Sequence, residues 1–285
     1  MPVPPRPPVC GVGGVTATNE VPLTRPLALV TGASSGIGED LARVFAREGW
    51  DLVLVARNGE KLRALGAELE TAHGIQCLAL PADLSEPSAP EAVWKALAGR
   101  PLEALVNNAG YAVAGSIAEV PLAAELGMFQ VNVLSLVALT KLALPGMLAR
   151  KSGRILNVAS TAAFQPGPFM GGYYASKALV LSYTEALAEE LRGTGVSATC
   201  LCPGPTRSNF FRRAELEGVT YLSRFGLASS RDVAELGYRG LMARRSLVVA
   251  GFLNRLLVFS VRLMPRRLIV RITRALQEKR GTGAR

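Results

Sequence analysis

The sequence predicts a doubly wound α/β fold, in which helices cover both faces of one parallel sheet of about seven strands. Short apolar segments alternate with longer amphipathic segments from residue 26 onward. The short segments are apolar throughout rather than at every second position, which is typical of parallel strands buried on both faces. The 285 residues, 49% of them hydrophobic, suffice for one large domain with a well-filled core.

We expect three parts: a Pro- and Gly-rich extension at 1–25, a domain at 26–251 and a basic amphipathic tail at 252–285. The extension lacks the apolar segment of a signal peptide and should be disordered; a mis-assigned start codon would explain it equally well. Within the domain, strands are expected at 27–30, 52–55, 75–80, 105–106, 155–158, 198–201 and 247–249. Apolar stripes mark the first two helices, at Ile37, Leu41, Val44 and Phe45 and at Leu62, Leu65 and Leu69.

A glycine-rich turn follows the first expected strand and predicts a binding site for a pyrophosphate. Glycine lets the backbone approach a phosphate closely, and a helix N-terminus offers unpaired N–H groups and the positive end of its dipole. An ordinary turn is the alternative, but the position between a strand and a helix favours binding. The residues expected at this site are Gly32, Ser34, Ser35, Gly36, Ile37 and Gly38.

The end of the second strand indicates which dinucleotide is bound. Folds of this kind that prefer NAD usually place an acidic residue here, which binds the ribose 2′-hydroxyl. Ala56 offers no carboxylate, whereas the Arg57 guanidinium can form a charged, forked hydrogen bond with the 2′-phosphate of NADP. We therefore expect NADP(H), with an arginine that merely ends a strand at the surface as the alternative.

A tyrosine and a lysine four residues apart form a candidate pair for proton transfer. Tyr173 and Lys177 share one face of an expected helix. A nearby ammonium favours phenolate, so Lys177 is expected to lower the pKa of Tyr173 from about 10 towards neutrality. Tyr174 is also near Lys177 on a helix, so spacing alone does not choose between the tyrosines. Ser160 lies thirteen residues before Tyr173, at the end of an apolar segment.

Composition argues against other kinds of site. His73 is the only histidine and is expected at the surface, so a Ser-His-Asp triad and a zinc site are not expected, and no metal site is predicted. Four cysteines are too few and too scattered for a disulfide framework, and Cys200 and Cys202 are expected to be buried apolar residues of one strand. A reducing cytoplasm is the expected location.

These residues, together with the segments 31–38 (TGASSGIG) and 107–110 (NNAG), resemble the short-chain dehydrogenase/reductase family, most closely bacterial members that prefer NADP. The resemblance covers about residues 26–251. It implies a Rossmann-type fold, hydride transfer between NADP(H) and a small-molecule carbonyl or alcohol, and a homodimer or homotetramer. The rival interpretation is a non-catalytic dinucleotide-binding or membrane-associated scaffold protein, which usually lacks one of the family's four catalytic residues.

The resemblance assigns all four catalytic roles. Tyr173, favoured over Tyr174 by its offset from Ser160, exchanges a proton with the substrate oxygen, and Ser160 hydrogen-bonds that oxygen. Lys177 holds the nicotinamide ribose, and Asn132 holds a water against Lys177. A structural kink is the alternative for Asn132, since an Asn is out of place in a long apolar helix. Further cofactor contacts are implied for Asp83, Leu84, Asn108, Ala109, Gly110, Pro203, Gly204, Thr206 and Ser208.

Two of these positions carry a qualification. Asp83 could equally cap a helix, and the family usually has Thr where this chain has Ser208, which keeps the hydroxyl. Residues 209–228 correspond to the family's mobile substrate loop. Their apolar content, at Phe210, Phe211, Tyr221, Leu222 and Phe225, indicates a greasy or extended substrate, unless these side chains only pack the loop.

The tail accounts for the basic charge of the chain. Residues 239–285 hold twelve Lys/Arg and one acid, which gives +11, so the rest of the chain contributes −1 to the total of +10. No nucleic-acid partner is expected from such a distribution. Arg255 and Arg262 argue against a spanning helix at 248–264. After Pro265, the arginines 267, 271 and 274 share one face, and Leu268, Ile272, Ala275 and Leu276 share another.

That pattern fits either peripheral contact with an anionic membrane or docking on the protein's own cleft or a partner subunit. Docking on protein is favoured by the apolar residues directly after the last strand, which would otherwise lie in water: Phe252, Leu253, Leu256, Leu257 and Phe259.

Overall fold

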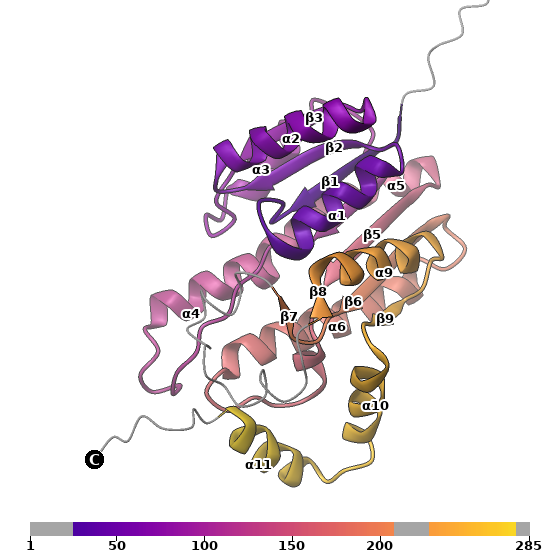
Figure 1. Ribbon diagram of the computed structural model, residues 1–285. Helices are drawn as coiled ribbons and strands as arrows, with labels where there is room; N and C mark the ends of the chain where they lie inside the picture. The colour runs from indigo at the N-terminus through magenta and orange to yellow at the C-terminus, as the bar shows by residue number, and fades with distance from the viewer. Residues whose placement is uncertain (1–24, 208–227, 278–285) are drawn as a thin grey trace, which may run out of the picture.

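A seven-stranded parallel sheet forms the centre of the protein in the computed structural model, which describes residues 25–207 and 228–277 (Figure 1). The strand order is β3-β2-β1-β4-β5-β6-β9. This confirms the predicted doubly wound α/β fold. The strands are β1 Leu27–Thr31, β2 Asp51–Ala56, β3 Cys77–Pro81, β4 Ala104–Asn107, β5 Gly153–Val158, β6 Val196–Cys202 and β9 Leu247–Val249.

All seven predicted strands are present, with small differences at their ends. The third strand begins at Cys77 rather than at Ile75, whose side chain is buried in the preceding connection. A separate pair of two-residue strands, β7 Thr206–Arg207 and β8 Ala228–Ser229, was not predicted. The expected extension at 1–25 lies outside the described residues except for Arg25.

Helices cover both faces of the sheet. Helices α1 Gly36–Arg47, α2 Gly59–His73 and α9 Ser230–Met242 pack on one face. On the other face lie α3 Ala89–Lys95, α5 Ser135–Arg150 and α6 Gly171–Glu190. The predicted apolar stripe of α1 points inward: the Phe45 ring meets the edges of Trp50 and Tyr238 at centroid distances of 5.2 and 4.9 Å. Such contacts each add about 0.5–1.5 kcal/mol to the burial of the rings.

Buried polar side chains tie the middle strands to the helices of the second face. Asn107, at the end of β4, donates hydrogen bonds to the Thr140 hydroxyl at 3.1 Å and to the Asn157 side-chain oxygen at 2.9 Å. Asn157 in turn donates to Thr184 of α6 at 2.9 Å. Since unpaired polar groups are costly in a protein interior, these bonds fix the register of β4, β5, α5 and α6 beneath the site.

The longest helical segment contains an irregular turn. Helix α4 Leu122–Phe129, the π-helical turn η1 Gln130–Leu134 and α5 run on as one segment of 29 residues, Leu122–Arg150. By length and composition this segment could cross a membrane, although 39% of its most apolar window is buried against the protein. Its inward side chains, such as Leu139 and Met147, belong to the core beside the sheet. We therefore treat it as a core helix.

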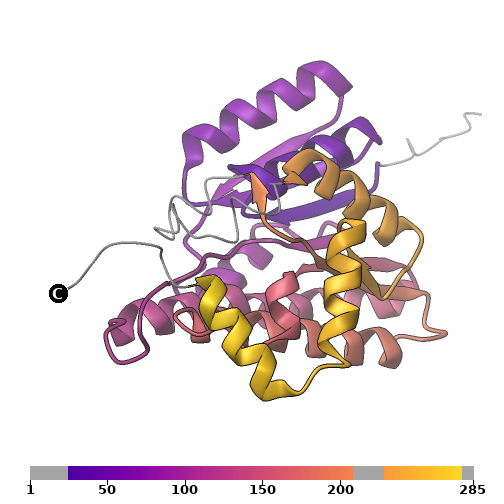
Figure 2. The ribbon, with the colours of Figure 1, turned by 60° about the horizontal axis from the view of Figure 1, so that its bottom comes forward.

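The C-terminal part of the chain forms two more helices, α10 Phe252–Val261 and α11 Arg266–Gln277, which make a V beside α6 (Figures 1 and 2). The sequence pattern places Leu268, Ile272, Ala275 and Leu276 on one face of the second helix. The structure divides that face: Leu268, Ile272 and Ala275 are exposed, whereas Leu276 is half-buried with the inward face that carries Ile269. The predicted grouping is wrong for Leu276, which shares the inward face of the helix with Ile269 rather than the outer face with Leu268.

Candidate active site

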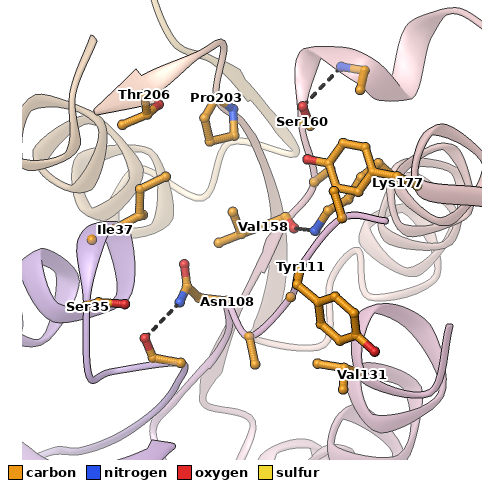
Figure 3. Close-up of a pocket in the computed structure, with 18 of the residues that line it drawn as sticks. Ser35, Ile37, Asn108, Tyr111, Val131, Val158, Ser160, Lys177, Pro203 and Thr206 are labelled. Atoms are coloured by element: carbon orange, nitrogen blue, oxygen red, sulfur yellow. Dashed lines mark hydrogen bonds between the residues drawn. The ribbon is translucent and has the colours of Figure 1, made fainter. Parts of the chain in front are cut away.

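A cleft of about 740 Å³ opens at the carboxyl ends of the central strands (Figure 3). Its volume is in the range of small-molecule sites. Most of the predicted site residues line it: Gly32, Ser34, Ser35, Gly36, Ile37, Arg57, Asp83, Leu84, Asn108, Ala109, Gly110, Ser160, Tyr173, Lys177, Pro203, Gly204 and Thr206. Two predicted residues, Gly38 and Asn132, lie behind its wall. Ser208 and the expected substrate loop at 209–227 lie outside the described residues.

Two glycines allow α1 to begin very close to the end of β1. Gly32 has a φ of +68°, and a Cβ there would lie 2.7 Å from the Asn108 amide nitrogen. A Cβ at Gly38 would lie 2.3 Å from the Gly32 carbonyl oxygen. Gly38 therefore acts through packing of the turn, without lining the cleft. The turn leaves the N-terminus of α1 open to the cleft, and the Ser35 side chain makes no capping hydrogen bond.

Thr31 holds the next wall of the cleft in place. Its hydroxyl accepts hydrogen bonds from the backbone N–H groups of Asn108 at 2.9 Å and Ala109 at 3.0 Å. The Asn108 side chain donates back to the Thr31 carbonyl at 2.9 Å. The sequence analysis did not assign this role to Thr31, and its only signal is a polar residue at the end of a buried strand.

Arg57 and Asp83 stand at the end of the cleft formed by β2 and β3. The Arg57 side chain is exposed and lines the cleft. The Asp83 carboxylate accepts hydrogen bonds from the backbone N–H of Ser85 at 3.0 Å and from its hydroxyl at 2.8 Å. The Ser85 backbone is the main cause that lowers the pKa of Asp83, and the charge of Arg57 adds a smaller effect. Asp83 lines the cleft and its carboxylate holds a local turn. The predicted alternative, a helix cap, is not seen, because α3 begins at Ala89 with Ser88 at its N-cap.

The three predicted residues of the reaction centre lie together on the opposite side. Ser160 follows β5 and precedes the 3₁₀ helix η2 Thr161–Phe164, where its Oγ accepts a hydrogen bond from the Ala162 N–H at 3.1 Å. Tyr173 and Lys177 come from the first turns of α6, and both side chains are buried. The Ser160 and Tyr173 side chains form a hydrogen bond.

Lys177 is held by the backbone of β5. Its Nζ donates a hydrogen bond to the Val158 carbonyl oxygen at 2.8 Å (Figure 3) and lies 6.0 Å from the centroid of the Tyr173 ring. Burial lowers the pKa of Lys177 to about 8, and the nearby Cys200 and Cys202 thiols oppose that shift. The ammonium is thus easily neutralised near physiological pH.

The expected fall in the pKa of Tyr173 is not seen. Burial raises that pKa, and the hydrogen bond with Ser160 only partly offsets the rise. The physical reason is that desolvation disfavours the phenolate, while the Lys177 ammonium is directed at the Val158 carbonyl. In this geometry Tyr173 is a neutral phenol, which suits a proton donor.

Asn132 lies behind the cleft, in the π-helical turn. Its amide donates to the Tyr111 carbonyl oxygen at 2.9 Å and to the Ser176 hydroxyl at 3.1 Å, and its oxygen accepts from the Tyr111 N–H at 3.0 Å. A Cβ on Gly110 would lie 2.9 Å from the Asn132 oxygen and 3.4 Å from Lys177 Nζ. Gly110 therefore keeps the two side chains near each other. The partners Tyr111 and Ser176 were not predicted.

Helix α11 closes the remaining side of the cleft. Docking of the tail on the protein's own cleft was one of the alternatives that the sequence left open. Thr273, Leu276 and Gln277 line the cleft. The Gln277 amide donates to the Tyr174 hydroxyl at 2.6 Å, and the Arg274 guanidinium lies 5.7 Å from the centroid of the Phe169 ring. Tyr174 thus anchors the wall of the cleft. The amphipathic pattern of the tail gave no signal for this pairing.

The remaining sequence expectations concern cysteine, histidine and metal. Cys200 and Cys202 are buried with their sulfur atoms 3.7 Å apart, and His73 is exposed at the end of α2, as predicted. Within 25–207 and 228–277, no cluster of His, Cys, Asp or Glu could hold a metal ion.

The family model described as short chain dehydrogenase matches residues 26–217. The chain belongs to this family. The ketoacyl reductase HetN of Nostoc sp. is 38% identical over 185 residues, which are 64% of each chain. The chain spans less than two thirds of the length of the curated relatives it matches first.

Two solved structures show the same fold and bind different dinucleotides. A short-chain dehydrogenase from Sphingobium yanoikuyae, in complex with NADPH, is 31% identical, with a TM-score of 0.75 over 82% of this chain and 92% of that one. A family member from Burkholderia phymatum, in complex with NAD, is 26% identical, with a TM-score of 0.76 over 91% and 98%. The chain thus shares its fold with family members that bind either dinucleotide, and both its activity and the choice between the two dinucleotides need further argument.

Proposed function

We propose that the protein transfers hydride between NADP(H) and an apolar ketone or the corresponding alcohol. The observation that carries this proposal is the presence of Ser160, Tyr173 and Lys177 on one side of a cleft whose far end carries Arg57. The completeness of the catalytic set argues against the non-catalytic scaffold. A scaffold would bind NADPH without turnover of any ketone.

The residues of the cleft fit a dinucleotide. The close approach of Gly32 and Gly38 leaves room for a pyrophosphate at the N-terminus of α1, where the Ser35 side chain makes no capping bond. The exposed Arg57 side chain lines the cleft just after β2 and would hold a 2′-phosphate, and Ala56 offers no competing carboxylate. When bound, the nicotinamide supplies the hydride to the carbonyl carbon.

The side chains of the reaction centre handle the proton. Tyr173, kept neutral by burial, donates its hydroxyl proton to the carbonyl oxygen as the hydride reaches the carbon, so that an alcohol forms. Ser160 donates a hydrogen bond to the same oxygen as negative charge develops there. Lys177, whose Nζ lies 6.0 Å from the centroid of the Tyr173 ring, would return a proton to the phenolate, with Asn132 holding a water against Lys177.

An apolar substrate is supported by the part of the cleft nearest Tyr173. Ala112, Met170 and Tyr174 belong to one apolar cluster with Tyr173 and, like Leu276, line the cleft. The name of the Nostoc relative, a ketoacyl reductase, fits a substrate in which a ketone is carried on an acyl chain. We further propose a cytoplasmic homodimer or homotetramer, in keeping with the free thiols of Cys77, Cys200 and Cys202.

Cofactor choice is tested by titrating NADPH and NADH into wild-type protein and Arg57→Ala. NADPH should bind more tightly than NADH by about 1.5 to 3 kcal/mol, the range for hydrogen bonds to charged groups, and Arg57→Ala should lose that preference. Arg192→Ala, which removes an exposed arginine from the turn just after α6, is the matched control and should keep the preference for NADPH. Equal affinities in the wild type would refute the assignment to NADP.

A further inference from the structure

The two C-terminal helices carry an exposed surface that the proposed reaction does not use. We call residues 252–277, which comprise α10, α11 and the turn between them, the docking arm. None of the side chains of α10 is buried, and in α11 only Ile269 and Thr273 are. Both views show the arm as a V at the outside of the molecule (Figures 1 and 2). The outer face of the arm is therefore in contact with solvent.

Apolar side chains form a continuous stripe on this surface. Phe252, Leu256, Phe259 and Leu263 recur every three or four residues, so they share one face of α10 and continue into the turn. Phe252 is 82% exposed and Leu263 is 73% exposed. On α11, Leu268 and Ile272 are exposed as well. A stripe of this extent on a soluble protein marks an interaction site.

Cations flank the apolar stripe, and no acid lies among them. Residues 252–277 contain neither Asp nor Glu. All six arginines of the arm are exposed, namely Arg255, Arg262, Arg266, Arg267, Arg271 and Arg274. The partner must therefore offer negative charge next to an apolar surface. The candidate partners can therefore be compared by whether they offer both features.

A second copy of the arm is a poor partner, because symmetric pairing would bring six arginines against six without a carboxylate between them. A nucleic acid would satisfy the arginines but leave the phenylalanines and leucines in water. The surface of an anionic bilayer satisfies both, since headgroups pair with the cations while the apolar stripe enters the acyl boundary. Helix α10 has ten residues and is too short to span, so it would lie in the membrane plane.

We propose that the docking arm binds the surface of anionic membranes. The inward face of α11 lines the cleft through Thr273 and Leu276. Binding of the arm consequently holds the entrance of the cleft beside the bilayer, where apolar ketones concentrate. The binding itself does not depend on the reaction that the cleft supports.

The test is co-sedimentation of the full-length protein with vesicles of mixed phosphatidylcholine and phosphatidylglycerol, with pure phosphatidylcholine as the neutral comparison. The wild type should sediment with the anionic vesicles at low ionic strength. The binding should weaken at about 1 M salt, where the Debye length falls to about 3 Å. Each cation near the surface contributes about a factor of five, so the double variant R262E/R271E should partition at least about 25-fold less.

Two matched controls separate the arm from general charge and apolarity. K95E/K141E makes the same change of net charge on exposed lysines of α3 and α5 and should bind vesicles much better than the arm variant. F259S/L263S should lose binding, whereas L122S/L126S, which removes exposed leucines from α4, should keep it. Thermal unfolding shows that each variant is folded.

Three results would overturn the proposal. The first is a wild-type protein that stays in solution with anionic vesicles at low salt. The second is an equal loss of vesicle binding in the arm variants and the control variants. The third is equal sedimentation of the wild type with neutral and with anionic vesicles. Size-exclusion chromatography adds a fourth. If the arm variants change the oligomeric size while vesicle binding persists, the arm is an interface between protein chains.

Discussion

At the scale of single residues, the two adjacent tyrosines of α6 have different neighbours. Tyr173 bonds with Ser160 in the reaction centre, whereas Tyr174 accepts a hydrogen bond from Gln277 of the C-terminal wall. Tyr173→Phe should therefore reduce kcat at least 100-fold, the low end for general acid catalysis, and leave NADPH affinity unchanged. Tyr174→Phe should cost far less in kcat. Steady-state kinetics with a ketone, beside NADPH titration, compare the two; the reverse ranking would show that the assignment is wrong.

Lys177 makes the free energy of unfolding depend on pH. Its pKa is about 8 in the folded protein, against 10.5 for an exposed lysine, so the unfolded chain binds this proton more tightly. The destabilisation is complete below about pH 8 and disappears as the pH rises towards 10.5. From about pH 7 to 9.5, the wild type should gain roughly 2 kcal/mol relative to Lys177→Met. Urea unfolding of both proteins at the two pH values measures this, and parallel pH profiles would contradict it.

The sequence identified these residues but not their protonation. The spacing of Tyr173 and Lys177 correctly places both on one face of a helix, and from that alone an ammonium should lower the pKa of the phenol. Burial and the Val158 carbonyl, which decide the outcome, are contacts between α6 and β5. Contacts of this kind depend on tertiary packing, and no local pattern encodes them. The same holds for Thr31, Tyr111 and Ser176, whose partners lie far away in the sequence.

At the scale of elements, α11 is the part of the cleft that belongs least to the sheet. Leu276 lines the cleft, whereas Ile272, one turn earlier, faces solvent. Leu276→Ala should thus lower kcat/KM for a bulky apolar ketone by roughly tenfold, within the range for loss of apolar contact in a pocket, without a change in NADPH affinity. Ile272→Ala removes similar apolar bulk from the outer face and is the control. Equal effects of the two substitutions would show that α11 does not contact the substrate.

The strands of the sheet were predictable because both of their faces are buried. The seven strands of the sheet are mostly apolar and nearly all of their residues are at least half-buried, and each was located within a few residues. The two short strands around 206 and 228 carry no such pattern and were missed. The C-terminal helices were recognised as amphipathic, but helical periodicity does not reveal which stripe packs on the protein. Leu276 was therefore grouped with the outer face, although it lines the cleft.

At the scale of the whole molecule, the site depends on the order of strands in the sheet. Apolar segments of similar composition could be arranged in several orders, and their pattern does not predict which order forms. In the observed order, β1 lies between β2 and β4, so the glycine turn, Arg57 and the 107–110 segment meet at one edge. β5 then adds Ser160 beside α6, which completes the cleft.

The central claim is that this cleft uses NADPH to reduce an apolar ketone. The most direct measurement follows NADPH absorbance as the wild-type protein is mixed with a panel of ketones of increasing apolar size, with NADH in a parallel series. The account predicts ketone-dependent oxidation of NADPH, faster with the apolar members than with small polar ones and slower with NADH. Tight binding of NADPH without oxidation by any ketone of the panel would contradict it and favour a non-catalytic dinucleotide-binding protein.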